Sequence, residues 1–513
     1  MHDVGASWLM TSLSPAPLMV ALVQGATALP VFLFSLPAGA LADILDRRRL
    51  LLAVQIFMGL VAACLGCIVL LDLVNAWSLL FFTLLMGTGA ALTAPAWQAI
   101  VPSLAPPGSL QRAIAANSVG VNISRAIGPA LAGLLITALG ITVPFFANAV
   151  SFLAVVAALL WWRPQAGKEP SLPPEHLLGA MLAGLRYARH SAPLKTTLIR
   201  AVAFFLFANA FWSLLPLVVR RVLGGGVGLY GIVLGCVGTG AVLGAFALPW
   251  LRARMDADRL VHLGTCGTAL AMLVLAMVNN PAAACLASLV AGTSWIAILT
   301  SLGVSAQTAL PDWVRARGLS IFVTVFFGSM TAGSLVWGQT AGMFGIQAAL
   351  IAAALLALLF IPLSARWKLQ QGLALQLAPS MHWPEPLVDG EIDQDRGPVL
   401  VTVEYRVDPE NVADFLNAMR ELHAERRHDG AYSWGLFEDA AQPGRYIEYF
   451  LVSSWLEHLR QHERVTVSGR EVQLRIQALQ SGGRMPLVSH LLAAGGRRMP
   501  PLSARPDASG GEP

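Results

Sequence analysis

The sequence predicts an all-α integral membrane protein with a small α+β domain at its C-terminal end. Of the 513 residues, 56% are hydrophobic and only 12% are charged, whereas a soluble domain carries about 25% charged residues. Long apolar runs recur through the first 370 residues, and residues 1–390 hold 20 basic against 11 acidic residues. In residues 391–513 apolar and polar residues alternate as in soluble domains, and this segment holds 14 basic against 18 acidic residues. These observations exclude a single soluble globule.

Eleven segments are long enough to cross a bilayer. A helix that spans about 30 Å of hydrocarbon needs roughly 20 mainly apolar residues, because lipid cannot satisfy backbone N–H and C=O groups. We expect spans at residues 16–41, 50–71, 77–101, 117–140, 142–162, 196–219, 227–251, 259–278, 282–305, 319–342 and 345–365.

The first residues resemble one end of a twelfth span. Met1 to Leu13 is apolar except for His2 and Asp3 and is followed by Pro15, but at 1.5 Å per residue it reaches only about 20 Å. Two interpretations remain. Either the first span begins upstream of Met1, which restores an even count of twelve, or the protein has eleven spans and a short re-entrant or interfacial start.

The basic residues orient the spans, since short cytoplasmic loops retain Lys and Arg. With the opening segment counted as span one, the loops after even-numbered spans and the segment after span twelve contain Arg47, Arg48, Arg49, Arg112, Arg163, Lys168, Arg186, Arg189, Lys195, Arg252, Arg254, Arg315, Arg317, Arg366 and Lys368. The opposite loops contain only Arg220 and Arg221. The loop 163–195 and the C-terminal region are therefore predicted to be cytoplasmic, and the basic excess needs no nucleic-acid partner.

Within this loop we expect a surface helix over Pro174 to His190. Its apolar side would carry Leu177, Leu178, Met181, Leu182 and Leu185. Arg186 and Arg189 would then face lipid headgroups.

An internal repeat divides the spans into two groups of six. A shift of 205–209 residues places Gln98–Pro102 over Gln307–Pro311, and Gly128–Gly133 over Gly333–Gly338. We therefore expect two bundles, residues 1–162 and 196–368, joined by the linker 163–195. Two similar halves about an axis along the membrane normal are typical of a transporter, because a site at their interface can open to either side.

The loop after the second span has a glycine, two acids and a basic cluster, namely Gly39, Asp43, Asp46, Arg47 and Arg48. It resembles the signature loop of the major facilitator superfamily. In that family this loop gates the cytoplasmic side. Charge that merely orients the chain would explain the arginines but not Asp43.

Longer strings are similar to the enterobactin-exporter-like branch of that superfamily, also called transmembrane secretion effectors. They are His2–Thr11, Pro37–Asp43 and Asn122–Gly133, and the resemblance covers roughly residues 1–370. It implies the major facilitator fold, location in the cell inner membrane, and export of siderophores or drug-like compounds driven by the proton gradient. No cofactor is expected.

Gly128, Pro129 and Gly133 are similar to the antiporter motif of span five in this superfamily. The chain has Ala132-Gly133 where a glycine pair is usual. The direction of transport therefore stays open, with an importer or a facilitator as alternatives.

Two ionisable residues lie deep in the predicted spans, where such a group costs at least about 2.5 kcal/mol. Arg125 lies about nine residues, or roughly 13 Å, into span five, and Asp3 is the only carboxylate within any span. If both face one cavity, Arg125 keeps Asp3 ionised until they separate and Asp3 takes a proton. We predict that this pair couples transport to protons. The alternatives are a capping or interfacial role for Asp3 and a structural bond to carbonyls for Arg125.

The other polar and aromatic residues within the spans are candidates for substrate contact: Gln24, Trp97, Gln98, Asn117, Asn122, Asn148, Asn209, Trp212, Trp295, Trp337 and Gln339. Such a set suits a large, mostly neutral, partly aromatic solute better than a sugar or a metal ion. From it we expect the cavity to be lined by Gln24, Asn122, Asn148, Asn209 and Trp212. Each residue also suits packing between helices.

After a linker, 369–397, residues 398–480 predict a cytoplasmic α+β domain. We expect strands at Val399–Val407, Ala431–Phe437 and Tyr446–Val452, helices at Pro409–Arg427 and Ser454–Arg464, and a last strand or helix within Val465–Leu479. From Ser481 onward, Gly, Pro and Arg predict a disordered tail, 481–513.

This order resembles the ferredoxin-like dimeric barrel of antibiotic-biosynthesis monooxygenases, on the strings Tyr432–Asp439 and Ser454–Arg464. The resemblance implies a dimer through this domain. His458 and His462 share a helix face, but without a third ligand at useful spacing we expect no metal site. A membrane-tethered enzyme or sensor is the alternative to a transporter. A tether would not need two six-span halves, so no enzyme is expected.

Overall fold

The computed structural model describes residues 1–104, 110–162, 177–311, 313–369, 392–393, 395–464, 467–481 and 486–494. The chain divides into two compact units. The first comprises Met1–Met181, Ala192–Ala309 and Arg315–Gln371. The second comprises Leu182–Ser191, Leu310–Val314 and Gly372–Pro513.

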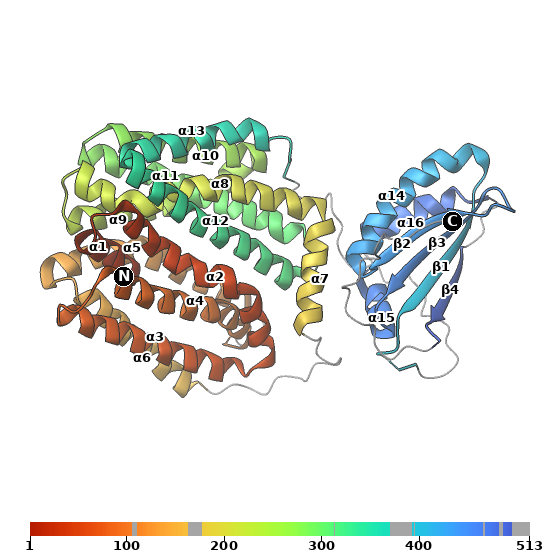
Figure 1. Ribbon diagram of the computed structural model, residues 1–513, viewed down its shortest axis with the longest axis horizontal. Helices are drawn as coiled ribbons and strands as arrows, with labels where there is room; N and C mark the ends of the chain where they lie inside the picture. The colour runs from red at the N-terminus through yellow and green to blue at the C-terminus, as the bar shows by residue number, and fades with distance from the viewer. Residues whose placement is uncertain are drawn as a thin grey trace, which may run out of the picture. The chain divides into compact units, whose positions relative to one another are not determined.

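The first unit consists of helices in two similar halves (Figure 1). The N-terminal half contains α1 (His2–Leu13), α2 (Pro17–Ile44), α3 (Arg47–Leu70), α4 (Ala76–Leu104), α5 (Leu110–Leu139) and α6 (Val143–Trp161). The C-terminal half contains α8 (Ala192–Leu217) with its π-helical extension η1 (Val218–Val222), α9 (Val227–Arg252), α10 (Ala257–Met277), α11 (Pro281–Thr308), α12 (Arg315–Phe344) and α13 (Ile346–Ser364). All eleven expected spans are helices.

In the described part of the chain, ten helices are long and apolar enough to cross a membrane. Helix α5 adds a shorter apolar stretch, Ile127–Leu139, and α1 has 12 residues. Local signals set several helix ends. Asp46 caps α3 by accepting the Arg49 N–H, and Asn280 caps α11. Such caps satisfy amide groups that have no partner within the helix.

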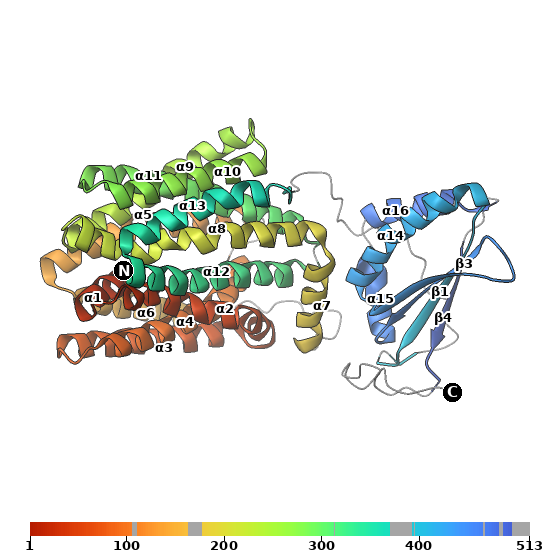
Figure 2. The same ribbon diagram turned by 45° about the horizontal axis from the view of Figure 1, so that its top comes forward.

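The two halves meet along two helix pairs, α2 with α12 and α5 with α9, and Figure 2 shows α12 beside α2. Small residues allow close approach. A Cβ added at Gly133 of α5 would lie 2.8 Å from the Cα of Gly231 on α9. A Cβ at Gly240 of α9 would lie 2.0 Å from the Leu289 carbonyl oxygen of α11. The glycines of α9 therefore serve close helix contacts.

The second unit contains a four-stranded antiparallel sheet in the order β2-β3-β1-β4. Its elements are β1 (Val399–Arg406), η2 (Pro409–Asn411), α14 (Val412–Asp429), β2 (Ser433–Glu438), β3 (Arg445–Val452), α15 (Trp455–Arg464), α16 (Val467–Ala478) and β4 (Leu487–Leu492). Helices α14 and α16 lie side by side against the sheet (Figure 1). The core between the sheet and these helices contains Val401, Phe415 and Phe450.

One strand lies where the composition predicts a disordered tail, so that expectation is wrong for Leu487–Leu492. This segment pairs antiparallel with β1, from Val399 opposite Leu492 to Glu404 opposite Leu487. Without it, β1 would present an unpaired row of N–H and C=O groups at the sheet edge. Residues 495–513 lie outside the described part.

Helix α7 (Leu177–His190) forms where a surface helix was expected, and its residues from Leu182 belong to the second unit. The expectation that Arg186 faces lipid headgroups is corrected, because its guanidinium donates to the Gly430 carbonyl oxygen at 2.9 Å. Tyr187 packs edge-on against Trp313, with ring centroids 6.0 Å apart.

Candidate functional site

Five aromatic side chains from α8, α11 and α12 form one group, which we call the aromatic cluster: Phe205, Trp212, Trp295, Phe326 and Phe327. Trp295 is at its centre, with ring centroids 5.2 Å from Trp212, 5.3 Å from Phe205 and 6.2 Å from Phe326. Phe326 lies 4.4 Å from Phe205 and 4.7 Å from Phe327. Edge-to-face contacts of this kind hold the rings in defined orientations.

The cluster lies about halfway along the helices of the bundle, and most of its side chains are only partly buried. Trp295 is the fifteenth of the 28 residues of α11, and all members except Phe205 are half-buried. Trp212 is on α8, the most enclosed candidate span, with 78% of its apolar stretch buried. The indole of Trp212 is therefore partly accessible on an otherwise enclosed helix.

The expectation that Asn209 lines the cavity is corrected by the structure. Its side chain has no exposed surface. Its amide nitrogen donates to the Met330 carbonyl oxygen and to the Ser334 hydroxyl, both at 2.9 Å. Asn209 therefore fastens α8 to α12.

The other predicted cavity residues lie in different helices. Trp212 is in the aromatic cluster, and Gln24 is half-buried on α2. Asn148 is half-buried on α6, and its amide nitrogen has no hydrogen-bond partner among the described residues. The side chain of Asn122 lies outside the described part.

Two residues of the predicted gating motif, Asp46 and Arg48, form hydrogen bonds within the N-terminal half. Asp46 accepts the backbone N–H of Arg49 at 2.8 Å. Arg48 donates to two carbonyl oxygens at the end of α6, those of Leu159 and Leu160, both at 2.8 Å. Arg47 is exposed, and the side chain of Asp43 lies outside the described part.

Gly39 is the member of the motif that faces the other half, because a Cβ at this position would lie 3.8 Å from the Ser320 hydroxyl of α12. One turn away, the Ser35 and Thr324 hydroxyls are 2.6 Å apart. The C-terminal end of α2 therefore contacts the N-terminal part of α12.

The antiporter-like motif meets the other half through its last residue. Gly133 touches Gly231 backbone to backbone, and the Pro129 carbonyl oxygen lies 3.4 Å from where a Cβ of Gly231 would be. At Gly128 no atom of another described segment lies within 4 Å of the corresponding position.

Asp3 is exposed on α1, and α1 contacts α5. The side chain of Arg125, on α5, lies outside the described part. The two residues therefore lie on neighbouring helices, and their pairing stays a prediction.

At the end of the first unit that carries Pro17, side-chain contacts connect the N-terminal half to the C-terminal half. Arg220 of η1 donates to the hydroxyls of Thr11 and Ser12, both at 2.7 Å. Trp8 of α1 stacks on Tyr230 of α9, with ring centroids 5.7 Å apart. These contacts join the halves at the opposite end of α2 from Arg47.

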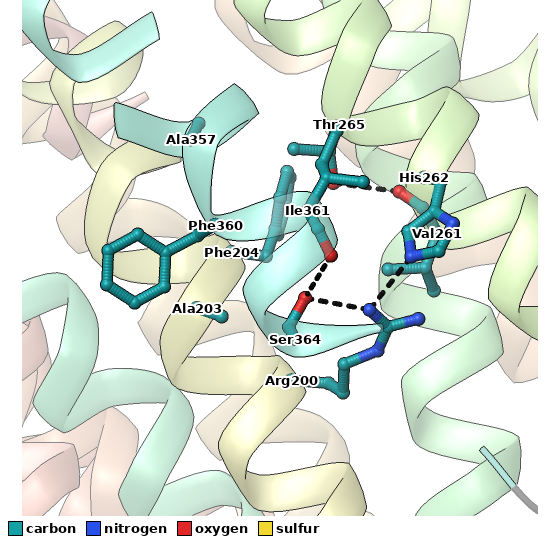
Figure 3. A pocket seen from close by; sticks show the side chains of 10 residues that line it. All are labelled: Arg200, Ala203, Phe204, Val261, His262, Thr265, Ala357, Phe360, Ile361 and Ser364. Atoms are coloured by element: carbon teal, nitrogen blue, oxygen red, sulfur yellow. Dashed lines mark hydrogen bonds between the residues drawn. The ribbon is translucent and has the colours of Figure 1, made fainter. Parts of the chain in front are cut away.

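A buried charged network in the C-terminal half is not among the sequence-predicted site residues (Figure 3). Arg200 of α8 is 2% exposed. It donates to Asp258 at 2.5 Å, to Nε2 of His262 at 2.9 Å and to the Ser364 hydroxyl at 2.8 Å. Asp258 also accepts the backbone N–H of Leu369 at 3.2 Å. The network joins α8, α10, α13 and the segment after α13 beside a small pocket.

A third histidine joins the pair on α15, which corrects the expectation that no further ligand is near. His490 of β4 lies with His458 and His462 so that one ligand atom of each is within 4.8 Å of the others. The sequence signal was present, but His490 falls in the segment assigned to the tail.

Comparison with known proteins identifies similar transporters. The family model described as transmembrane secretion effector matches residues 1–498. A staphyloferrin A transporter of Staphylococcus aureus is 23% identical over 67% of this chain and 86% of its own length. A multidrug efflux pump, Tap of Mycolicibacterium fortuitum, is 23% identical over 69% and 88%.

Solved structures share the fold. A bacterial homologue of the human lysosomal transporter Spinster, in an inward-facing and unoccupied conformation, superposes with a TM-score of 0.56 at 16% identity. A mutant of the nucleoside transporter NupG gives 0.61 at 10% identity. Each alignment covers 71% of this chain and 94% of the other.

Proposed function

Because the chain belongs to the transmembrane secretion effector family of major facilitator transporters, we propose that it is a proton-coupled exporter of a small organic molecule. It works by alternating access in the cell inner membrane, with its C-terminal α+β domain in the cytoplasm. The aromatic cluster is the observation that carries the proposal, since it offers half-buried ring faces at mid-depth.

The substrate class follows from the chemistry of the cluster. Indole and phenyl faces stack on flat, apolar or conjugated surfaces, and such pairs contribute about 0.5–1.5 kcal/mol beyond area burial. One relative is a staphyloferrin A transporter and another is a multidrug efflux pump. A siderophore or a drug-like compound with an aromatic part fits both the cluster and these relatives.

Alternating access requires that contacts between the two halves form at one end while those at the other end break. The hydrogen bonds of Arg220 with Thr11 and Ser12 close one end between the halves. Each hydrogen bond from a charged donor stabilises by about 1.5–3 kcal/mol net, so a bound substrate can compensate for their loss when this end opens. The contact of Gly39 with α12 is the corresponding junction at the other end.

For the C-terminal domain we propose a regulatory or dimerising role. The strand order matches a ferredoxin-like sheet, and the β2 and β4 edges carry exposed apolar side chains, Phe437, Leu487, Val488 and Leu491. Two copies would cover these residues. A membrane-tethered enzyme is the alternative.

Transport in everted membrane vesicles tests the proposal with a planar aromatic dye. We expect energised vesicles to accumulate the dye, and Trp295→Ala or Trp212→Ala to raise the half-saturating concentration up to about tenfold. Trp161→Ala is the matched control, because Trp161 is 90% exposed at the end of α6. Uptake into right-side-out vesicles would indicate an importer.

Deletion of residues 390–513 separates a transporter from a tethered enzyme. A transporter with a regulatory domain retains efflux. Turnover of a compound that disappears with the deletion, in a protein that never transports, would contradict the proposal.

A further inference from the structure

Three histidine side chains of the second unit converge from two elements that are distant in the sequence. His458 and His462 are one turn apart on α15, and His490 is on β4 opposite Val401 of β1. Nε2 of His458 lies 3.2 Å from Nε2 of His462. The ring centroids of His458 and His490 are 4.7 Å apart.

Packing leaves polar atoms at this point without partners. His458 has no exposed surface, and its Nδ1 has no hydrogen-bond partner among the described residues. The amide of Gln461, on the same helix, is also fully buried. Trp455 covers the group, with its ring 5.3 Å from His458 and 6.2 Å from His490. Buried polar atoms are normally bonded, so this arrangement indicates a ligand.

The surroundings keep the three imidazoles neutral. Burial, and then the neighbouring imidazoles, lower the pKa of His458 to about 3. Burial lowers the pKa of His462 to about 4 and also lowers that of His490. The nearby Arg426 guanidinium is paired with Glu448 at 3.0 Å. Neutral imidazole is the form that binds a metal.

We propose that His458, His462 and His490 form a binding site for a divalent transition-metal ion, with zinc the best fit. Zinc–nitrogen bonds of about 2.0–2.1 Å in a tetrahedron place ligand atoms about 3.3 Å apart. Two of the three nitrogens already have this spacing. Imidazole ligands suit zinc, copper, nickel and iron, whereas calcium and magnesium prefer oxygen.

The site has room for a fourth ligand and a supporting residue. His462 and His490 are half-buried, so water or an external group can complete the tetrahedron. Gln461, fully buried on the same helix, is the residue that would support the His458 ring once a metal is bound. The metal would hold β4 to α15.

Zinc titration of the full-length chain, purified in detergent without a histidine tag and stripped with a chelator, tests the site. We expect one zinc ion per chain, measured by competition with a chromophoric chelator. His490→Ala should weaken binding at least about tenfold. His423→Ala should leave it unchanged, because this histidine stacks on Trp434 away from the group.

Cobalt binding can be measured on the wild-type chain, so this test does not require a substituted variant to fold. A tetrahedral nitrogen site produces an intense visible spectrum, whereas loosely bound hydrated cobalt produces a weak one. The proposal is overturned if the wild-type chain binds less than one ion or gives only the weak spectrum. It is also overturned if folded His490→Ala, verified by circular dichroism, binds zinc as tightly as His423→Ala.

Discussion

Arg200 and Asp258 show how a charged pair persists inside an apolar bundle. Desolvation of two charges costs several kcal/mol, and their attraction offsets it only when further hydrogen bonds satisfy the remaining atoms. His262, Ser364 and the Leu369 N–H supply most of these bonds, whereas Nε of Arg200 has no partner among the described residues. The network therefore acts as a fastening between three helices of the C-terminal half.

Arg200→Gln should destabilise the chain by about 3 kcal/mol, because it leaves Asp258 without its charged partner in a mainly buried position. Thermal unfolding in detergent measures the effect. Arg259→Gln is the matched control. Its ion pair with Asp256 is exposed, so the change should be under about 1 kcal/mol. Equal effects of the two substitutions would show that the buried network contributes no special stability.

Asp3 is the predicted proton carrier, and Asp3→Asn should abolish proton-coupled efflux while expression is retained. An amide cannot bind and release the proton that a carboxylate carries. Dye transport by vesicles under an imposed pH gradient measures the coupling. Asp72→Asn, an exposed acid after α3, should change nothing. Normal coupling in Asp3→Asn would refute the assignment.

At the scale of elements, the contact of α5 with α9 depends on two glycines that touch backbone to backbone. A side chain at either position would separate the helices, and the two halves with them. Gly128, on the same helix, has no neighbour at this distance among the residues that the structure describes. Glycines of one motif thus differ in what they do.

Gly133→Ala should reduce transport and lower the unfolding temperature, because the new methyl group would lie 2.8 Å from the Gly231 Cα. Overpacking of this kind costs about 1–3 kcal/mol. Gly128→Ala is the matched control and should be neutral. Dye efflux and thermal unfolding of the two variants are compared. Similar behaviour of the pair would mean that the close approach is dispensable.

At the scale of the whole molecule, the two six-helix halves and the division of basic residues predict one membrane orientation. Arg47 and Arg315 begin α3 and α12, which are the third helix of one half and the fifth of the other. Both residues follow an even number of predicted spans. Arg221, in η1, follows an odd number.

Cysteine accessibility tests this orientation in a background without the five native cysteines. We expect Arg47→Cys and Arg315→Cys to react only with a reagent on the cytoplasmic side. Arg221→Cys should react from the other side. Opposite sides for Arg47 and Arg315 would refute the pairing of the halves.

The sequence by itself determined the apolar spans, the repeat and the family, and it predicts an orientation. The spans can be recognised from local sequence, because a helix in lipid must satisfy its own backbone hydrogen bonds and so requires a long apolar run. The strands and helices of the α+β domain were predicted from alternation and helical periodicity. Among the described segments of this domain, Leu487–Leu492 was wrongly assigned to a disordered tail.

Tertiary structure alone decided which side chains meet. Asn209 forms hydrogen bonds with α12 rather than facing a cavity. Arg200 of α8 forms an ion pair with Asp258 of α10. His490 reaches α15 only because β4 pairs with β1. A helix or strand periodicity shows which residues share a face, but the partner of that face depends on how distant segments pack, and no local pattern contains this information.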